Sequence, residues 1–108
     1  MAINDLLDIS KVEVSDTMLN VTEASINEMI RLSVKMAEPV ARKSGISIVT
    51  ELDELIPITA FDPQRIRQVC VNLLGNAIKF SSPGGKVTVS SICGDGEIIV
   101  SVRDEGPG

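Results

Sequence analysis

Apolar side chains recur along this chain with two different periods, which divide it into segments of helix and strand. Over residues 26–41, and again over residues 66–77, they return every three or four positions. This spacing places them on one face of an α-helix. In the stretches between and after these two segments, apolar and polar residues alternate, which is typical of strands with one buried face.

The first long helix is predicted to begin after Thr22 and to end before Gly45. Thr22 can act as the N-cap, and a glycine shortly after Lys43 is a common helix terminator. Pro39 lies inside the helix and is expected to bend it or loosen one turn. The predicted buried face consists of Ile26, Met29, Ile30, Val34, Ala37, Val40 and Ala41.

The second long helix is predicted to run from Asp62 to about Phe80. Asp62 supplies a side-chain cap, and Pro63 suits the first helical position. The sequence SSPGG at residues 81–85 ends the helix. The side chains predicted to face a sheet are Ile66, Val69, Cys70, Leu73 and Ala77.

Short strands are predicted over residues 18–21, 46–52 and 58–61, and two longer ones over 86–93 and 97–103. The two longer strands flank the sequence GDG, which is a strong signal for a β-hairpin. This order of elements predicts an α+β fold, a two-layer sandwich with helices on one face of a mixed β-sheet.

The N-terminal residues 2–13 are predicted to form a short amphipathic helix. Its apolar positions are Ile3, Leu6, Leu7 and Ile9, set among polar residues. A helix of about three turns is marginal alone and needs a surface to pack against. Two interpretations stay open: a terminal helix that docks on its own domain, and the end of a longer dimerisation helix.

Composition narrows the possible functions. The chain of 108 residues has a net charge of −5 and only two aromatic residues, which argues against nucleic-acid binding. It has neither a secretory signal nor an apolar run long enough to span a membrane, so a cytoplasmic location without membrane contact is expected. Cys70 and Cys93 are expected to be buried, reduced thiols. The chain contains no histidine, which excludes His-based triads and a phosphohistidine on this polypeptide.

A second stripe of side chains on the central helix can bind a ligand. Asn72, Asn76 and Lys79 share one helical period beside the apolar stripe, and Phe80 falls between the two stripes. A carboxamide oxygen suits magnesium that already bridges phosphates, and lysine can meet a phosphate oxygen. The phenylalanine can cover a ribose or base edge. The alternative is an ordinary solvated face of asparagine and lysine.

The C-terminal sequence DEGPG is a second candidate element of a binding site. Asp104 could accept a hydrogen bond from an exocyclic amine, which distinguishes adenine from guanine, and Gly106 and Gly108 allow backbone to approach a ligand closely. The alternative is a simple turn. The sequence GGK at residues 84–86 lacks the other residues of a phosphate-binding P-loop.

Taken together, these segments resemble the catalytic, ATP-binding domain of sensor histidine kinases, within the gyrase/Hsp90/histidine kinase/MutL group of ATPases. Residues 68–80 (QVCVNLLGNAIKF) are similar to the family's N box, and residues 104–108 are similar to its first glycine box. Residues 39–46 and 61–66 also resemble family segments, and residues 4–13 resemble the end of the second dimerisation helix. The resemblance implies a partial histidine-kinase-type ATPase fold.

The resemblance also implies a role for each site residue, with ATP and Mg²⁺ as cofactors. Asn76 would be the magnesium ligand and Asn72 would support the metal and phosphates. Lys79 would contact phosphate, Phe80 would line the nucleotide pocket, and Asp104 would bind the adenine amine. ATP-hydrolysing members of the group carry a glutamate at the position of Asn72, because a carboxylate activates water. Phosphotransfer is therefore favoured over hydrolysis, and no catalytic residue is assigned in this chain.

The resemblance divides the chain into residues 1–15, the end of a dimerisation helix, and residues 16–108, the N-terminal part of an ATP-binding domain. The later glycine boxes, the lid and the last strands would follow Gly108, and the phosphoacceptor histidine would precede Met1. The parent kinase would transfer phosphate to histidine and use a response regulator as partner. This chain alone is expected to bind Mg-ATP weakly or not at all and to be inactive. The alternative is a non-catalytic, dimerising interaction module.

Self-association is expected from the predicted last strand. If residues 97–103 would normally pair with strands that lie beyond this sequence, their edge is open, and it is apolar. A homo-oligomer is therefore predicted, formed through this strand edge or through the N-terminal helix.

Overall fold

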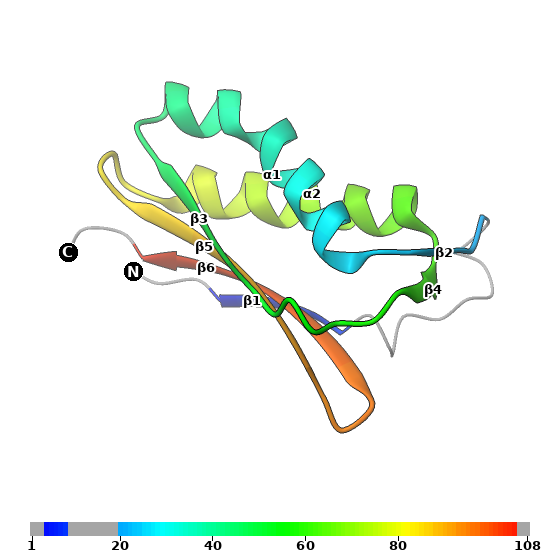
Figure 1. Cartoon of the computed structure of the whole chain (residues 1–108). Coiled ribbons are helices and arrows are strands. Elements are labelled where there is room, and N and C mark those ends of the chain that lie inside the picture. Colours follow the sequence, from blue (N-terminus) through cyan, green and yellow to red (C-terminus); the bar gives the residue numbers. More distant parts are fainter. Residues whose placement is uncertain (1–3, 9–19, 106–108) are drawn as a thin grey trace.

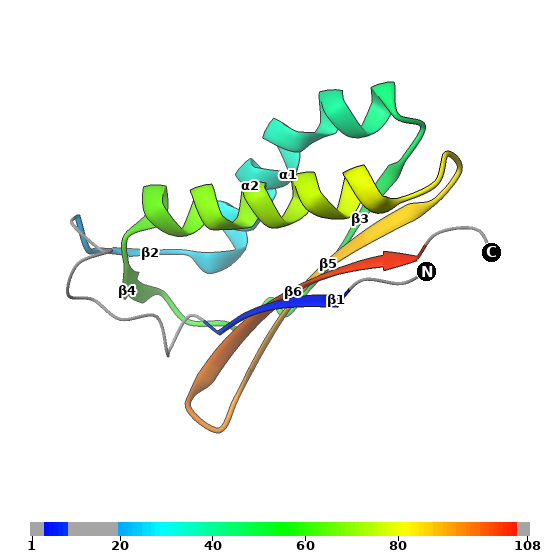
Figure 2. The same cartoon turned by 180° about the vertical axis from the view of Figure 1, so that it is seen from behind.

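The computed structural model describes residues 4–8 and 20–105, and within them two helices cover one face of a four-stranded sheet (Figure 1). Figure 2 shows the same two layers from behind, and among the described residues no helix lies on the other face of the sheet. The α+β sandwich predicted from the sequence is confirmed. In chain order the elements are β1 (Asn4–Asp8), β2 (Thr22–Ala24), α1 (Ile26–Lys43), β3 (Ser47–Leu52), β4 (Thr59–Phe61), α2 (Pro63–Phe80), β5 (Lys86–Gly94) and β6 (Glu97–Glu105).

The sheet is mixed, with the strand order β1-β6-β5-β3. β5 and β6 form the predicted hairpin, and Asp95 and Gly96 at its turn both have positive φ. This is the backbone that a tight two-residue hairpin turn requires. β3 pairs in parallel with β5, so the chain has to cross over between them, and α2 lies in that crossover. β2 and β4 form a separate two-stranded sheet.

The start of α2 agrees with the sequence. The Asp62 side chain caps the helix by accepting a hydrogen bond from the Arg65 backbone N–H at 3.1 Å, and Pro63 follows in the first turn. The second carboxylate oxygen of Asp62 accepts from the Asn20 backbone N–H at 3.1 Å. One buried side chain thus fixes both the helix start and the segment that leads into β2.

The start of α1 differs from the prediction. Ser25, not Thr22, is the N-cap, and its hydroxyl accepts a hydrogen bond from the Glu28 backbone N–H at 3.2 Å. Thr22 instead pairs with Phe61 in the β2–β4 ladder. The strand predicted over residues 18–21 is therefore displaced to Thr22–Ala24, and its first two residues, 18 and 19, lie outside the described residues.

The hydrophobic core lies between the helices and the sheet. α2 packs against both the sheet and α1, so its buried face is turned toward α1 and includes Leu74 and Ile78, while Val69 and Leu73 are only partly buried. On α1 the prediction was wrong for Val40, which is exposed. The buried apolar residues are Ile26, Met29, Ile30, Ala37, Ala41, Ile46, Phe61, Ile66, Cys70, Leu74, Ala77, Ile78, Val87, Val89, Ile98, Val100 and Val102.

The N-terminal segment is the largest departure from the sequence-based prediction. Asn4–Asp8 is a strand that pairs antiparallel with β6 over Ile99–Arg103, so the predicted helix is wrong for these residues. A five-residue segment has too few turns to form a stable helix alone, and a strand edge offers it backbone hydrogen bonds. The rest of the predicted helix lies outside the described residues.

This pairing also changes the prediction of self-association. β6 has β5 on one side and β1 on the other, so its edge is not open. Self-association through that edge, or through an N-terminal helix that includes Asn4–Asp8, has no basis in the described part of the chain. Among residues 4–8 and 20–105, neither helix combines the length and the apolar character that crossing a bilayer demands.

The two cysteines lie in different surroundings, and both are free thiols. Cys70 is a residue of α2 whose side chain is buried in the core. Burial raises the pKa of its thiol, and a hydrogen bond with Ser33 lowers this pKa in part. Cys93 is exposed, contrary to the prediction. It lies in the last residues of β5, where the hairpin extends beyond the helices (Figure 1).

A buried polar network connects the two layers near the start of α1. The Asn27 amide nitrogen donates to the Asp53 carbonyl at 2.8 Å, and its amide oxygen accepts from the Ser91 hydroxyl at 2.8 Å. The same Ser91 hydroxyl accepts from the Asp53 backbone N–H at 3.0 Å. Since buried polar groups are costly when left unpaired, this network fixes α1 relative to the end of β3.

Replacing Asn27 by alanine should therefore destabilise the fold. The change leaves the Asp53 carbonyl and the Ser91 hydroxyl short of partners, and we expect the free energy of unfolding to fall by about 1–3 kcal/mol. Urea denaturation followed by circular dichroism measures this. Lys35→Ala, at an exposed position of the same helix, is the control and should stay within about 0.5 kcal/mol of the parent. Equal effects of the two substitutions would contradict this account of the network.

Candidate functional site

The polar stripe predicted on the central helix is present on the exposed side of α2. Asn72, Asn76 and Lys79 are all exposed, while Cys70, Leu74, Ala77 and Ile78 are buried on the other side of the helix. Their positions follow from helical geometry: residues three, four and seven apart share a face. Burial of the apolar stripe leaves the two carboxamides and the ammonium group in solvent.

Lys79 and Phe80 lie in the last turn of α2. The Lys79 ammonium is 5.8 Å from the centroid of the Phe80 ring, a cation–π distance, and the ring is 61% exposed. An apolar ring with this much exposure is available to cover a ligand. The lysine also lies near the carboxyl end of the helix, where a cation is favoured.

Asp104 is the residue of the candidate site with the most unusual surroundings. It lies on β6, and its side chain follows those of Val100 and Val102 on the face toward the helices. It is 0% exposed. One carboxylate oxygen, Oδ1, is 2.5 Å from the Ser81 hydroxyl, whereas Oδ2 is buried and has no hydrogen-bond partner among the described residues.

An orphaned, buried acceptor is rare in native proteins and needs an explanation. An amine donor from a ligand would satisfy Asp104 Oδ2, and the exocyclic amine of adenine is such a donor. The residues present therefore fit the base of an adenine nucleotide. The sequence pattern alone also allowed a simple turn, and the burial of Asp104 with an unpaired oxygen could not be read from it.

Ser81 belongs to the candidate site and was missed by the sequence analysis. It ends α2, and its hydroxyl lies 2.8 Å from the Ala77 carbonyl as well as 2.5 Å from Asp104 Oδ1. Its side chain thus joins the end of α2 to β6 across 23 positions of sequence. The only signal in the sequence was its position directly after the polar stripe. Gly106 and Gly108, the remaining predicted residues, lie outside the described residues.

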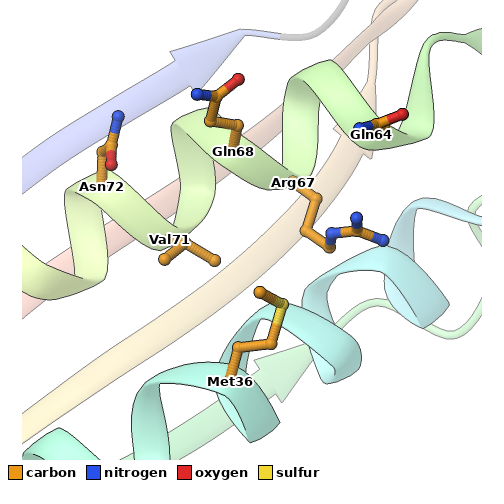
Figure 3. A pocket seen from close by; sticks show the side chains of 6 residues that line it. All are labelled: Met36, Gln64, Arg67, Gln68, Val71 and Asn72. Carbon is orange, nitrogen blue, oxygen red and sulfur yellow. The ribbon is translucent and has the colours of Figure 1, made fainter.

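A groove of about 280 Å³ lies between α2 and α1 and is lined by residues of both helices. Figure 3 shows Met36 on α1 pointing toward Arg67 and Val71 on α2, while Gln68 and Asn72 point away from α1. Asn72 is the one residue that lines this groove and also belongs to the predicted stripe. The groove is a separate feature from the Asp104 end of the site.

Comparison with known proteins gives a consistent result. Residues 61–108 match the family described as histidine kinase-, DNA gyrase B-, and HSP90-like ATPase. The chain is 36% identical over 107 residues to the cell-division control histidine kinase PdhS of Brucella anthropi. That match covers 98% of this chain and 10% of PdhS, so the chain spans about a tenth of the length of this curated relative.

Solved structures of histidine kinases share the fold. The nucleotide-free catalytic domain of ThkA matches with a TM-score of 0.75 and 34% identity, over 82% of this chain and 61% of that chain. ThkA in complex with the response regulator protein TrrA matches with a TM-score of 0.72 and 34% identity, over 81% and 26% of the two chains. Full-length ShkA in complex with AMPPNP matches with a TM-score of 0.75 and 32% identity, over 83% and 19%.

The orphaned oxygen of Asp104 predicts that this residue lowers the stability of the fold. Asp104→Val removes a buried carboxylate, and the Ser81 hydroxyl keeps the Ala77 carbonyl as an acceptor. We expect the free energy of unfolding to rise by about 1 kcal/mol, since an apolar residue is better suited to this buried position. Urea denaturation of the two proteins measures the difference.

Glu51→Val is the matched control for this measurement, because Glu51 is exposed on a strand of the same sheet. Both substitutions introduce the same β-branched residue, so any gain from strand propensity is common to them. A gain confined to Asp104→Val supports the interpretation. A loss of stability at position 104 would show that the carboxylate contributes to the fold.

Proposed function

We propose that this chain is the N-terminal part of a nucleotide-binding domain of a sensor histidine kinase. The premise is that residues 61–108 match the histidine kinase-, DNA gyrase B-, and HSP90-like ATPase family. The observation that carries the proposal is Asp104, a fully buried carboxylate with one oxygen left without a partner among the described residues. It supplies the acceptor that an adenine amine needs. The exposed carboxamides on α2 supply the oxygen ligands that a magnesium–phosphate group needs.

Each residue of the site has a proposed role. Asp104 Oδ2 accepts a hydrogen bond from the adenine amine, and Phe80 covers the nucleotide near the end of α2. The Asn76 side-chain oxygen ligates Mg²⁺, and the neighbouring Asn72 supports the metal and the phosphates. Lys79 meets a phosphate oxygen. Gly106 and Gly108 are included in the proposal because glycine allows backbone to approach a nucleotide closely.

The chemistry at Asn72 favours phosphotransfer over hydrolysis. A carboxamide cannot take a proton from water, so this side chain cannot serve as the general base that hydrolysis requires. The bound Mg²⁺ would neutralise charge on the phosphates during transfer. The role left for this chain is to bind and orient the nucleotide, and positioning is the main contribution of a protein to phosphoryl transfer.

The full-length parent is proposed to be cytoplasmic in this region and to transfer phosphate from ATP to a histidine of its dimerisation hairpin. We propose that residues 16–108 belong to the ATP-binding domain, and that residues 1–15 connect it to the preceding part of the parent. A response regulator is the proposed partner of the parent, and the complex of the related kinase ThkA with TrrA supports this.

Titration with Mg-ADP tests nucleotide binding by this chain. We expect millimolar-range binding, with amide chemical-shift changes at Asn76, Asp104 and Gly106 in NMR spectra. Asn76→Ala should weaken binding roughly tenfold, because it removes a group that interacts with a charged metal–phosphate ligand. Gln64→Ala is the matched control, since Gln64 is exposed on α2 and lines the groove that faces α1.

No shift at millimolar Mg-ADP would refute nucleotide binding by this chain. The second candidate function would then remain, a non-catalytic interaction module that keeps only the fold. A specific observation favours it: Leu32, Met36 and Val40 are exposed along α1 at intervals of four residues, and Met36 also lines the groove. Such a stripe is suited to a partner surface, including that of a second copy of the chain.

Incubation with radiolabelled Mg-ATP tests autophosphorylation. The chain contains no histidine, the residue type proposed to accept phosphate in the parent kinase. We therefore expect no label on the purified chain, whether or not it binds nucleotide. A parent kinase with an intact dimerisation hairpin is the positive control. Any label on this polypeptide would overturn the proposed role.

A further inference from the structure

We propose that the outer edge of β3 is a docking site for β3 of a second copy of this chain. The two strands run antiparallel in the proposed dimer and join the two sheets into one. Among the described residues β3 pairs only with β5, and the strand order β1-β6-β5-β3 places it at the margin of the sheet. The inference goes beyond nucleotide binding, because no residue of the proposed nucleotide site lies on β3.

The backbone of β3 presents hydrogen-bonding groups at this edge. The N–H groups of Ser47 and Asp53 donate at 3.2 Å to carbonyls in or next to β5. Successive residues of a strand direct their backbone groups to opposite sides, so every second residue between these two also bonds to β5. Ile48, Thr50 and Leu52 therefore direct their N–H and C=O groups away from β5, toward the outer edge.

The strand lacks most of the features that prevent pairing between sheet edges. Its sequence SIVTEL contains neither proline nor lysine, and its register with β5 is regular along the whole strand. Glu51 is its one charged residue. Ile48 and Leu52 are half-buried and pack against the core, so the side of the edge that faces the helices is apolar. An edge of this kind is suited to accept another strand.

One antiparallel register uses all the backbone groups that point outward. With Thr50 opposite Thr50 of the second copy, Ile48 lies opposite Leu52 of the second copy, and each pair can exchange both of its backbone hydrogen bonds. The apolar side chains of Ile48 and Leu52 then meet across the new strand pair. Glu51 lies opposite Val49 of the second copy, so the two acidic side chains do not face each other.

The charges at the two ends of β3 favour the antiparallel orientation. Arg42 and Lys43 precede the strand, whereas its last residues and the turn after it carry Glu51, Asp53 and Glu54. An antiparallel partner brings the acidic end of one copy to the basic end of the other. A parallel partner would instead bring like charges together, which is unfavourable.

A groove beside the start of β3 can receive the acidic end of the second copy. It measures about 260 Å³ and is lined by Glu38, Ala41, Arg42, Ile46, Ser47 and Ile48. In the proposed register, Glu54 of the second copy lies opposite Ile46, which lines the same groove as Arg42. The Arg42 side chain has no ion pair or hydrogen bond within residues 4–8 and 20–105, so it is available to a partner.

Sedimentation equilibrium of the chain without nucleotide tests the proposal. We expect a dimer with a dissociation constant of about 100 μM, because one strand pair makes a small interface. Thr50→Pro removes an N–H that points at the outer edge, and proline is tolerated at such a position. It should weaken association at least roughly tenfold, since both copies lose a backbone donor. Thr50→Val keeps the N–H and is the matched control, which should leave association unchanged.

Charge reversal provides a second test, which stays informative if Thr50→Pro unfolds the chain. Arg42 and Glu54 are both exposed, so their substitution should leave the fold intact. Arg42→Glu should weaken association roughly fivefold at low ionic strength, and Arg42→Glu combined with Glu54→Arg should restore it. Arg65→Glu is the matched control, because it makes the same change of charge at an exposed position of α2, away from the groove.

The outcomes separate this docking surface from other modes of association. Slower amide hydrogen exchange at Ile48, Thr50 and Leu52 with rising protein concentration would support the proposal. A chain that stays monomeric at about 1 mM would overturn it. So would a dimer that is insensitive both to Thr50→Pro and to charge reversal, because it must form through another surface, such as the exposed apolar stripe of α1. Since no nucleotide is present, failure of Mg-ADP binding would leave the result unaffected.

Discussion

Helix α2 has to bury one face against both the sheet and α1, and the rest of the structure depends on this double burial. Cys70, Leu74, Ala77 and Ile78 are packed between the two layers. Because the helix cannot rotate without exposing these side chains, the opposite face is fixed in solvent together with its carboxamides and its lysine. The same packing brings the end of α2 to β6, where Ser81 meets Asp104.

The elements that the sequence predicted well are those whose signals are local. Asp62 and Pro63 start α2, and the hairpin turn at Asp95 has the positive φ that its glycine-rich sequence requires. The N-terminal segment was predicted wrongly because a five-residue strand is decided by the edge that it joins, and no period within residues 4–8 reports on that edge. Thr22 failed as a cap for the same reason, since its pairing with Phe61 is a long-range contact.

The same contrast between local signals and long-range contacts applies to the candidate site. The stripe of Asn72, Asn76 and Lys79 could be predicted because helical spacing alone places the three side chains together. The Ser81–Asp104 contact could not, because it joins two elements through a turn and a strand. Sequence also gave no means to tell that Asp104 is buried with an unpaired oxygen. That property depends on the neighbours β6 receives from the fold.

The two ends of the proposed site differ in how strongly the fold buries and orients their side chains. The base end is buried and oriented: Asp104 is fully enclosed and held by one donor. The phosphate end is exposed, with Asn76, Lys79 and Phe80 all accessible to solvent. Exposed charges are screened and contribute little binding energy, whereas an acceptor that is already held by a hydrogen bond loses little conformational freedom when a donor pairs with it. The residues described here therefore provide selectivity for the base more than affinity for the phosphates, and tight binding would require further groups to enclose the phosphate end.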